Sequence, residues 1–148
     1  MHPMEGVARL SEWAGPDLAH NLDFIPDDRL NWKPTADSKS ALECAAEAAF
    51  FMKSMIPVLA GAEWARSDHS QPSKAEIQDT LRTASKEYAA ALRAVPIERL
   101  GEVVSMPFGD LPLGQIATFP VVDVIHHRGQ ICYLQTMLGD KENHFLMA

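Results

Sequence analysis

Apolar residues recur every three or four positions over four stretches of this chain, the spacing of one buried face of an α-helix. The first stretch lies within residues 3–24, where Gly15-Pro16 predicts a kink or a fresh helical start. The second and third stretches each open with a serine followed three residues later by a glutamate, the pattern of a capping box. These boxes are Ser40-Ala-Leu-Glu43 and Ser73-Lys-Ala-Glu76.

The ends of these helices are also marked in the sequence. The second helix is expected to close at Gly61, with Pro57 ending or kinking its last turn, and the third to stop at Val95-Pro96. The fourth stretch predicts one helix from about Leu113 to Leu138, with Gly139 after its end. Such a helix has roughly 26 residues and a length of about 39 Å, and Pro120 is expected to bend it.

Two connections complete the expected fold. Residues 25–34 read as a structured connector because Leu30 and Trp32 are apolar anchors. Residues 96–112 are rich in proline and glycine and predict a long crossover, with a short extended piece at Glu102–Met106. With no convincing β alternation, the pattern predicts an all-α four-helix bundle that forms a single domain over residues 1–148.

Composition narrows the range of partners. The formal net charge of −7 and the pI of about 5.3 argue against nucleic acid or an anionic membrane as the main partner. No apolar run reaches the roughly 18 residues of a membrane span, and no signal peptide is visible at the N-terminus. Cys44 and Cys132 lie in apolar helical stretches and read as small buried thiols, so a cytoplasmic location is expected.

Candidate chemistry is concentrated in Asp123-Val-Ile-His-His-Arg-Gly-Gln130. His127 falls on the buried stripe of the last helix, with Asp123 one turn before it on the same face, while His126 points toward solvent. A buried imidazole needs a partner, which is either a carboxylate that accepts its hydrogen bond or a metal ion. Arg128 is expected to pair with an acid or a helix end, Gly129 to admit a close helix and Gln130 to bond a backbone carbonyl.

Three segments together resemble the DinB-like superfamily. His127-Arg-Gly-Gln-Ile131, followed by Met137-Leu-Gly139, looks like its signature in the last helix. Leu30-Asn-Trp-Lys-Pro34 and Ser40-Ala-Leu-Glu43 are similar to the segment before the family's second helix and to the opening of that helix. The resemblance implies a bundle in up-down-down-up order with a long crossover between helices three and four.

The resemblance also implies a divalent metal, often nickel or zinc, held by three histidines. In this chain the corresponding positions are Glu47, Asp123 and His127, so only one imidazole remains. One imidazole and two carboxylates form a known facial ligand set, and harder oxygen donors favour manganese or iron more than three histidines do.

Two functions of different class follow from the resemblance. The first is a divalent-metal-dependent enzyme, with Ni, Zn, Mn or Fe held by these three residues. It acts on a small-molecule substrate with a low-molecular-weight thiol, as a thiol-dependent S-transferase or a related hydrolase or isomerase. The second is a non-catalytic bundle with a degenerate metal site that acts in binding or interaction. A homodimer is implied for many relatives, and Trp64, Tyr133 or the first helix can supply apolar area for it.

Overall fold

The computed structural model describes residues 1–68 and 70–147. Helices make up most of the described chain, and four of them are long: α1 (Glu5–Leu22), α2 (Ala41–Leu59), α3 (Lys74–Ala94) and α5 (Phe119–Met137). The shorter elements lie in the connections: η1 (Asp27–Arg29), η2 (Ile97–Gly101), β1 (Val103–Met106), β2 (Gly109–Pro112) and α4 (Leu113–Ile116). The all-α bundle expected from the sequence is therefore confirmed, with one small hairpin added to it.

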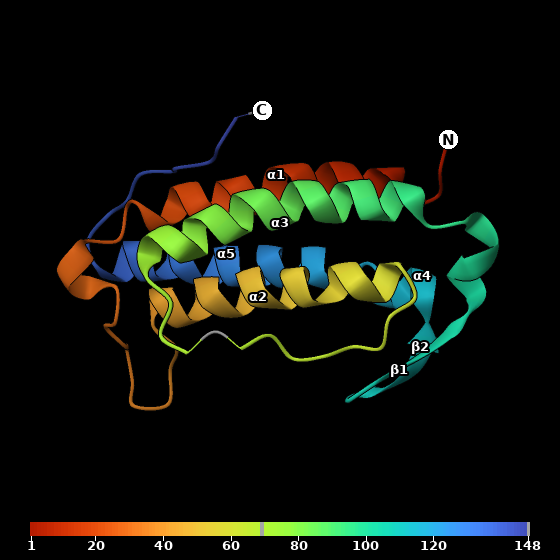
Figure 1. Ribbon diagram of the computed structural model, residues 1–148. Coiled ribbons are helices and arrows are strands. Elements are labelled where there is room, and N and C mark those ends of the chain that lie inside the picture. Colours follow the sequence, from red (N-terminus) through yellow and green to blue (C-terminus); the bar gives the residue numbers. More distant parts are fainter. Residues whose placement is uncertain (69, 148) are drawn as a thin grey trace.

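The long helices form two layers, with α1 and α3 above α2 and α5 (Figure 1). Helix α1 packs against α3 and α5, and α2 packs against the same two helices from the other side. Helices α1 and α5 run in one direction and α2 and α3 in the other (Figure 1). This arrangement places α2 beside α5, which are the two helices that carry the candidate site.

Both capping boxes have formed. At the start of α2 the Glu43 amide donates to Ser40 Oγ at 3.2 Å, and the Ser40 amide donates to Glu43 Oε2 at 2.8 Å. Ser73 and Glu76 make the same reciprocal pair at the start of α3. Each box satisfies two backbone amides that have no partner inside the helix, so local sequence alone fixes where these helices begin.

Helix α1 is continuous through Gly15-Pro16, so the chain makes no fresh helical start there; whether Pro16 kinks the helix stays a prediction. Its backbone lies so close to α3 that a Cβ on Gly15 would stand 1.6 Å from Ser85 Oγ and 2.6 Å from the Leu81 carbonyl oxygen. The neighbouring Ser11 hydroxyl donates to the Ser85 carbonyl at 2.9 Å. Gly15 thus permits close packing of α1 against α3.

The last helical stretch is divided in two, so the expected single helix from Leu113 to Leu138 is wrong. The chain leaves α4 at Ala117 and starts α5 at Phe119, with Pro120 in the first turn of the new helix. A proline is well placed there because the first amides of a helix have no intrahelical acceptor. Pro120 therefore begins a helix instead of bending one.

Two connections differ in their course. Residues 60–73, of which 69 is not described, join α2 to α3 and return along the length of the bundle, below α2 in Figure 1. Residues 95–112 stay at one end, where β1 pairs with β2 in an antiparallel hairpin from Val103 opposite Pro112 to Met106 opposite Gly109. The extended piece expected near residues 102–106 is confirmed, whereas its partner strand had no visible alternation.

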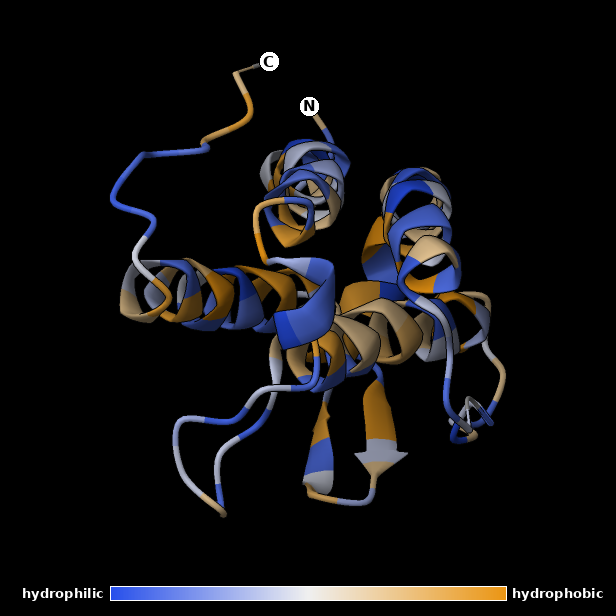
Figure 2. Ribbon diagram, turned by 90° about the vertical axis from the view of Figure 1, so that its left-hand side faces the viewer, coloured by the Kyte–Doolittle hydropathy of each residue, from blue (hydrophilic) through white to orange (hydrophobic). Residues whose placement is uncertain are grey.

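The core lies between the two layers, and hydrophobic colour is concentrated on the surfaces that the helices turn toward one another (Figure 2). Helix α2 contributes mainly small side chains, and α3 contributes Tyr88, whose buried hydroxyl donates to the Ala117 carbonyl at 2.8 Å. Among the described residues, no helix combines the length and the apolarity that crossing a bilayer requires.

Candidate functional site

The imidazole of His127 is the centre of the candidate site. The side chain is 5% exposed and projects from α5 toward α2. Its Nδ1 lies 2.7 Å from Gln130 Oε1, and an amide oxygen only accepts hydrogen bonds. Nδ1 therefore carries a proton, and in the neutral ring Nε2 is left with its lone pair. Gln130 was expected to bond a backbone carbonyl, and that expectation is wrong.

Two carboxylates face this Nε2 atom. Glu47 Oε2 from α2 lies 3.4 Å away, and Asp123 Oδ1 from the preceding turn of α5 lies 3.5 Å away. The three side chains expected from the sequence therefore lie together, and their role as metal ligands stays a prediction. His126, the neighbouring residue, is exposed, as its position on the helix predicts.

Burial shifts the protonation of Asp123. Its carboxyl group has a raised pKa because it is withdrawn from water, and the Glu47 carboxylate raises that pKa further. The nearby His127 imidazole acts in the opposite direction. A divalent cation placed here would favour the ionised form of Asp123, since it would offset both unfavourable effects.

Lys39 is the residue that sequence reasoning missed. Its ammonium group donates to Glu47 Oε2, the same oxygen that approaches His127. The pKa of Lys39 is raised, chiefly by this bond, and the Asp123 carboxylate adds a smaller effect of the same sign. The Lys39 and Glu47 side chains are 47% and 45% exposed, so Glu47 lies at the rim of the bundle rather than inside it.

One imidazole nitrogen and two carboxylates are suitable ligands for a divalent ion, but the three side chains are not yet arranged around a single point. Two atoms bound to one ion at about 2.1 Å stand roughly 3.0–3.4 Å apart, close to both separations measured from His127. Yet within residues 1–68 and 70–147 no group of three His, Cys, Asp or Glu side chains is already arranged to hold a metal. Lys39 meanwhile bonds the same Glu47 oxygen that faces His127, so a bound ion would compete with this lysine.

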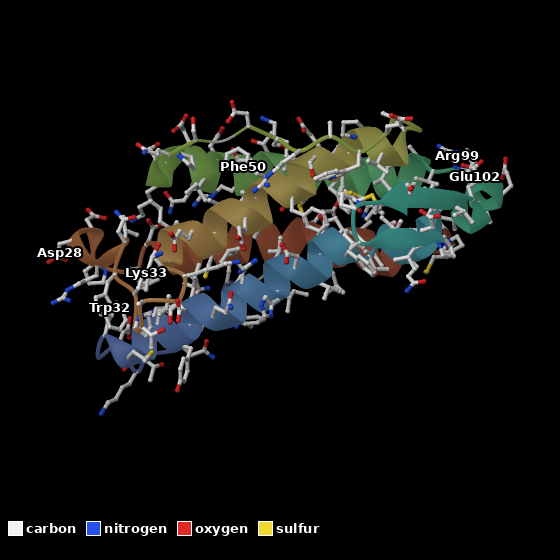
Figure 3. All side chains as sticks on the ribbon, turned by 90° about the horizontal axis from the view of Figure 1, so that it is seen from below. Asp28, Trp32, Lys33, Phe50, Arg99 and Glu102 are labelled. Atoms are coloured by element: carbon white, nitrogen blue, oxygen red, sulfur yellow. The ribbon has the colours of Figure 1, made fainter. Side chains whose placement is uncertain are left out.

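Hollows surround the site. One of about 460 Å³ is lined by Lys39, Cys44, His127 and Tyr133 among others. Another of about 290 Å³ lies along α2 and the returning connection, where Glu47 and Asp123 form part of the wall. Phe50 also lines this second hollow. On the face of the bundle seen in Figure 3, it lies midway between Lys33 at one end and Arg99 at the other. The site is therefore open to small molecules.

The neighbouring thiols are poor nucleophiles. Burial raises the pKa of the Cys44 thiol to about 11 and also raises that of Cys132. A thiol in this state is almost fully protonated near neutral pH and reacts slowly. In the absence of a metal ion, neither thiol is activated as a nucleophile.

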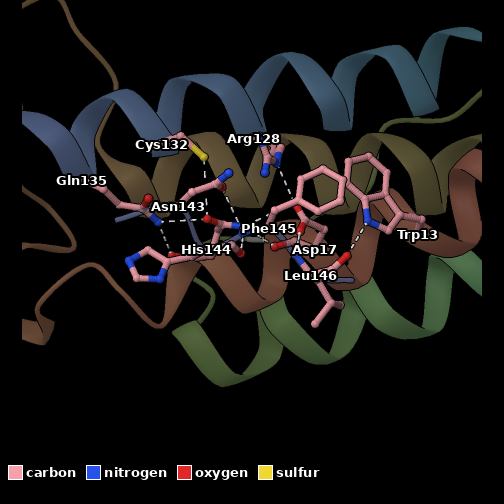
Figure 4. A network of polar contacts seen from close by, with 10 residues as sticks. Trp13, Asp17, Arg128, Cys132, Gln135, Asn143, His144, Phe145 and Leu146 are labelled. Atoms are coloured by element: carbon pink, nitrogen blue, oxygen red, sulfur yellow. Dashed lines mark hydrogen bonds and ion pairs between the residues drawn. The ribbon is translucent and has the colours of Figure 1, made fainter. Parts of the chain in front are cut away.

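Arg128 has a structural role on the opposite side of α5. Its Nε donates to Oδ2 of the fully buried Asp17 of α1 at 2.5 Å, which matches the acid partner expected for it. The C-terminal tail covers this pair, because the Leu146 amide donates to Asp17 Oδ1 at 2.6 Å and the Phe145 ring lies over the guanidinium (Figure 4). Gly129 was expected to admit a close helix, and that expectation is wrong: a Cβ placed on it would meet no atom of another helix of the described residues within 4 Å.

Taken together, these features define a small helical-bundle protein with an imidazole between two carboxylates where its second and last long helices meet. The sequence profile of the DinB superfamily matches residues 12–131. The chain therefore belongs to the DinB superfamily.

The solved structures support the same fold. A DinB-like protein from Bacillus subtilis superposes with a TM-score of 0.73, over 93% of this chain and 94% of that chain, at 14% sequence identity. Identity this low speaks for the fold alone. No curated protein matches the sequence.

Proposed function

We propose that this protein is a divalent-metal-dependent enzyme that acts on a small molecule, with Glu47, Asp123 and His127 as the metal ligands. The observation that carries the proposal is the orientation of His127. Gln130 Oε1 accepts a hydrogen bond from the Nδ1–H group, so the lone pair of Nε2 is left to face the two carboxylates. A ligand histidine in proteins is commonly held in this way, with its second nitrogen donating to an oxygen.

The ligand types narrow the choice of ion and chemistry. A site of one imidazole and two carboxylates favours Mn²⁺ or Fe²⁺ more than a site of three histidines does. Zn²⁺ and Ni²⁺ are further candidates. A bound ion supplies Lewis acidity that lowers the pKa of a coordinated thiol or water. The chain itself orients His127 through Gln130 and leaves a hollow of about 460 Å³ open beside it.

Membership in the DinB superfamily supports the proposed class of enzyme. A thiol-dependent S-transferase, hydrolase or isomerase that uses a low-molecular-weight thiol remains the reaction type we propose. The raised pKa of Cys44 agrees with an external thiol, since the thiol beside the site is held protonated. The directions of the long helices support the up-down-down-up order expected for such a bundle (Figure 1).

A second candidate is favoured by the contact between Lys39 and Glu47. That contact neutralises one of the two carboxylates without any ion. In this case the protein is a non-catalytic bundle in which the site is a polar cluster at a binding surface. The two candidates differ in whether a divalent ion displaces the lysine.

Metal binding measured by calorimetry on untagged, chelator-treated protein separates the candidates. We expect Mn²⁺, Fe²⁺, Zn²⁺ or Ni²⁺ to bind one site per chain and His127→Ala to abolish that binding. His126→Ala is the matched control, because it removes an adjacent but exposed imidazole. Gln130→Ala is expected to weaken binding roughly 10- to 100-fold by releasing the ring orientation.

The non-catalytic candidate predicts a different set of results. None of the four ions would bind the native chain at stoichiometric amounts, and the two histidine variants would behave alike. That pattern would refute the proposed function. Binding that survives in His127→Ala would also refute it, since the ion would then occupy some other site.

A further inference from the structure

We infer that the hollow beside the candidate metal site takes a small anionic molecule with an aromatic or other flat apolar body, and that Arg66 binds its anionic group. The inference deepens the proposed function, and it rests on that function for the idea that such a molecule is the substrate. Its basis is the composition of the hollow of about 290 Å³ between α2 and the returning connection.

The apolar part of this hollow is made by aromatic rings. Phe50 and Phe51 project from α2, and Trp64 comes from the connection that returns along the bundle. Phe51 and Asp123 also line an adjoining hollow, whose other walls include Phe108 and Phe119. The centroids of the Phe108 and Phe119 rings lie 5.8 Å apart. A flat ring is therefore offered aromatic surface from the hairpin and from both site-bearing helices.

Hydrogen bonds hold the indole of Trp64 in place. Its Nε1 donates to Ser54 Oγ at 3.0 Å, and that hydroxyl donates in turn to the Phe51 carbonyl at 2.7 Å. Because its one polar atom is already satisfied, the indole presents an apolar surface to the hollow. A wall fixed in advance loses little conformational freedom when a ligand binds, which favours affinity.

Charge selects the sign of the ligand. Arg66 lines the same hollow as Glu47 and Asp123, is exposed, and has no ion pair among residues 1–68 and 70–147. Glu47, in contrast, is already paired with Lys39. The guanidinium is thus a cation of this hollow without an ion pair among the described residues, and its planar donors suit a carboxylate, sulfonate or phosphate.

The size of the hollow limits the ligand. A volume of about 290 Å³ lies at the small end of ligand pockets, which run from roughly 300 to 1,000 Å³. One or two fused rings with a single anionic group fit this range. Such a molecule would place its body against Phe51 and Trp64 and its anionic group at Arg66, beside the ligands of the proposed metal.

Two fluorescent probes of similar shape test the inference. 1-Naphthalenesulfonate carries an anionic group, and 1-naphthalenesulfonamide has the same aromatic frame without the charge. We expect Arg66→Gln to weaken the affinity for the sulfonate about tenfold and to leave the affinity for the neutral probe within about twofold. Arg66→Lys is expected to restore most of the loss, because it keeps the charge.

Arg82→Gln is the matched control, since it removes the same charge from an exposed position on α3 away from the hollow. It should leave the affinity for both probes within about twofold. The inference is overturned if Arg66→Gln weakens both probes equally, if it weakens neither, or if Arg82→Gln has the same effect.

A second arm separates this inference from the proposed metal site. The titrations are run first on metal-free protein, where the Arg66 comparison alone decides the inference, and then with Mn²⁺ present. We expect Mn²⁺ to raise the affinity for the sulfonate in the native chain and not in His127→Ala. No response to Mn²⁺ together with a clear Arg66 effect would reject the metal site while leaving the anionic aromatic ligand in place.

Discussion

Breaking the buried ion pair between Asp17 and Arg128 is expected to destabilise the bundle far more than breaking an exposed one. The Asp17 side chain is fully buried, and the Arg128 side chain is 20% exposed. Besides Arg128, the Asp17 carboxylate accepts only from the Leu146 amide at 2.6 Å and from Asn21 Nδ2 at 3.2 Å among the described residues. Arg128→Met removes its single cationic partner and leaves a charge in the interior.

The magnitude follows from these contacts. Removing one partner of a buried ion pair costs about 3–5 kcal/mol. Two hydrogen bonds to the carboxylate remain and Arg128 is partly wet, so the lower end, about 3 kcal/mol, is expected for Arg128→Met. Asp17→Asn should cost less, about 2 kcal/mol, because the guanidinium can reach water and still lies over the ring of Phe145.

The double variant gives the sharper test. With both charges removed no buried charge is left, so we expect its free energy of unfolding to be no worse than that of Arg128→Met alone. The coupling energy between the two sites is then about 2 kcal/mol, within the range found for residues in one polar network. Urea unfolding followed by far-UV circular dichroism measures all four chains, and an unchanged m-value shows that the unfolded states are comparable.

Additive losses, with a coupling below about 0.5 kcal/mol, would refute this reasoning. Arg93→Met is the control, because Arg93 also bridges carboxylates, those of Glu5 and Glu12, but at the surface. Its effect should be clearly smaller and should shrink with added salt. A chain that ends at Glu142 lacks the tail over Asp17 and should show a weaker coupling between Asp17 and Arg128, since water then reaches the pair.

Further predictions concern the site and the surface. Lys39→Met should tighten Mn²⁺ binding in calorimetry by about two- to fivefold, as an exposed ion pair is worth about 0.2–1 kcal/mol, and weaker binding would contradict a competing role. The pKa of Cys44 is raised to about 11 in the folded chain, so between about pH 9 and 11 the unfolded chain loses this proton more readily than the folded one. The contribution of the protonated thiol to the free energy of unfolding is therefore fully present below about pH 9 and is lost as the pH rises toward 11. The free energy of unfolding of Cys44→Ala should therefore decrease less steeply with pH over that range than that of the native chain. The homodimer stays a prediction: light scattering should give about twice the 16.3 kDa chain mass, and Tyr133→Glu, on the exposed face of α5, should return a monomer, whereas a native monomer would reject it.

The start of α2 and of α3 could be predicted because the responsible interactions are local. A serine and the glutamate three residues later form both bonds of a capping box, so four residues of sequence contain the whole cause. Gly15-Pro16 could not be interpreted in this way. The structure shows that a glycine is needed there because Ser85 of α3, some seventy residues further along the chain, leaves no room for a Cβ.

The division of the last helical stretch was misjudged for a different reason. A proline inside a periodic apolar stretch is compatible with a bend or with a new first turn, and periodicity does not distinguish them. The second strand of the hairpin was missed because Gly109–Pro112 has neither β-branched residues nor alternation. It forms through pairing with Val103–Met106, which is a tertiary effect.

The site shows the same division between local and distant causes. Helical spacing was enough to place His127 beside Asp123, and family resemblance pointed to Glu47. His127 and Gln130 are three residues apart on one helix, a spacing that places their side chains side by side. The sequence therefore allowed this bond, although a backbone carbonyl was expected as the partner of Gln130. Lys39 had no signal, because it precedes α2 and reaches Glu47 only through the fold of the connector.

The charges around the site link metal binding to the binding of an anion. Without an ion, the carboxylates of Glu47 and Asp123 are opposed by the cations Lys39 and Arg66. A divalent ion adds two positive charges to this balanced group, and either Lys39 must leave or an anion must enter to restore the balance. Since coupling between two ligands is reciprocal, an anionic molecule at Arg66 should strengthen metal binding as much as the metal strengthens the binding of the anion. These four charges therefore favour a site that binds its metal ion firmly only when the anionic substrate is also bound.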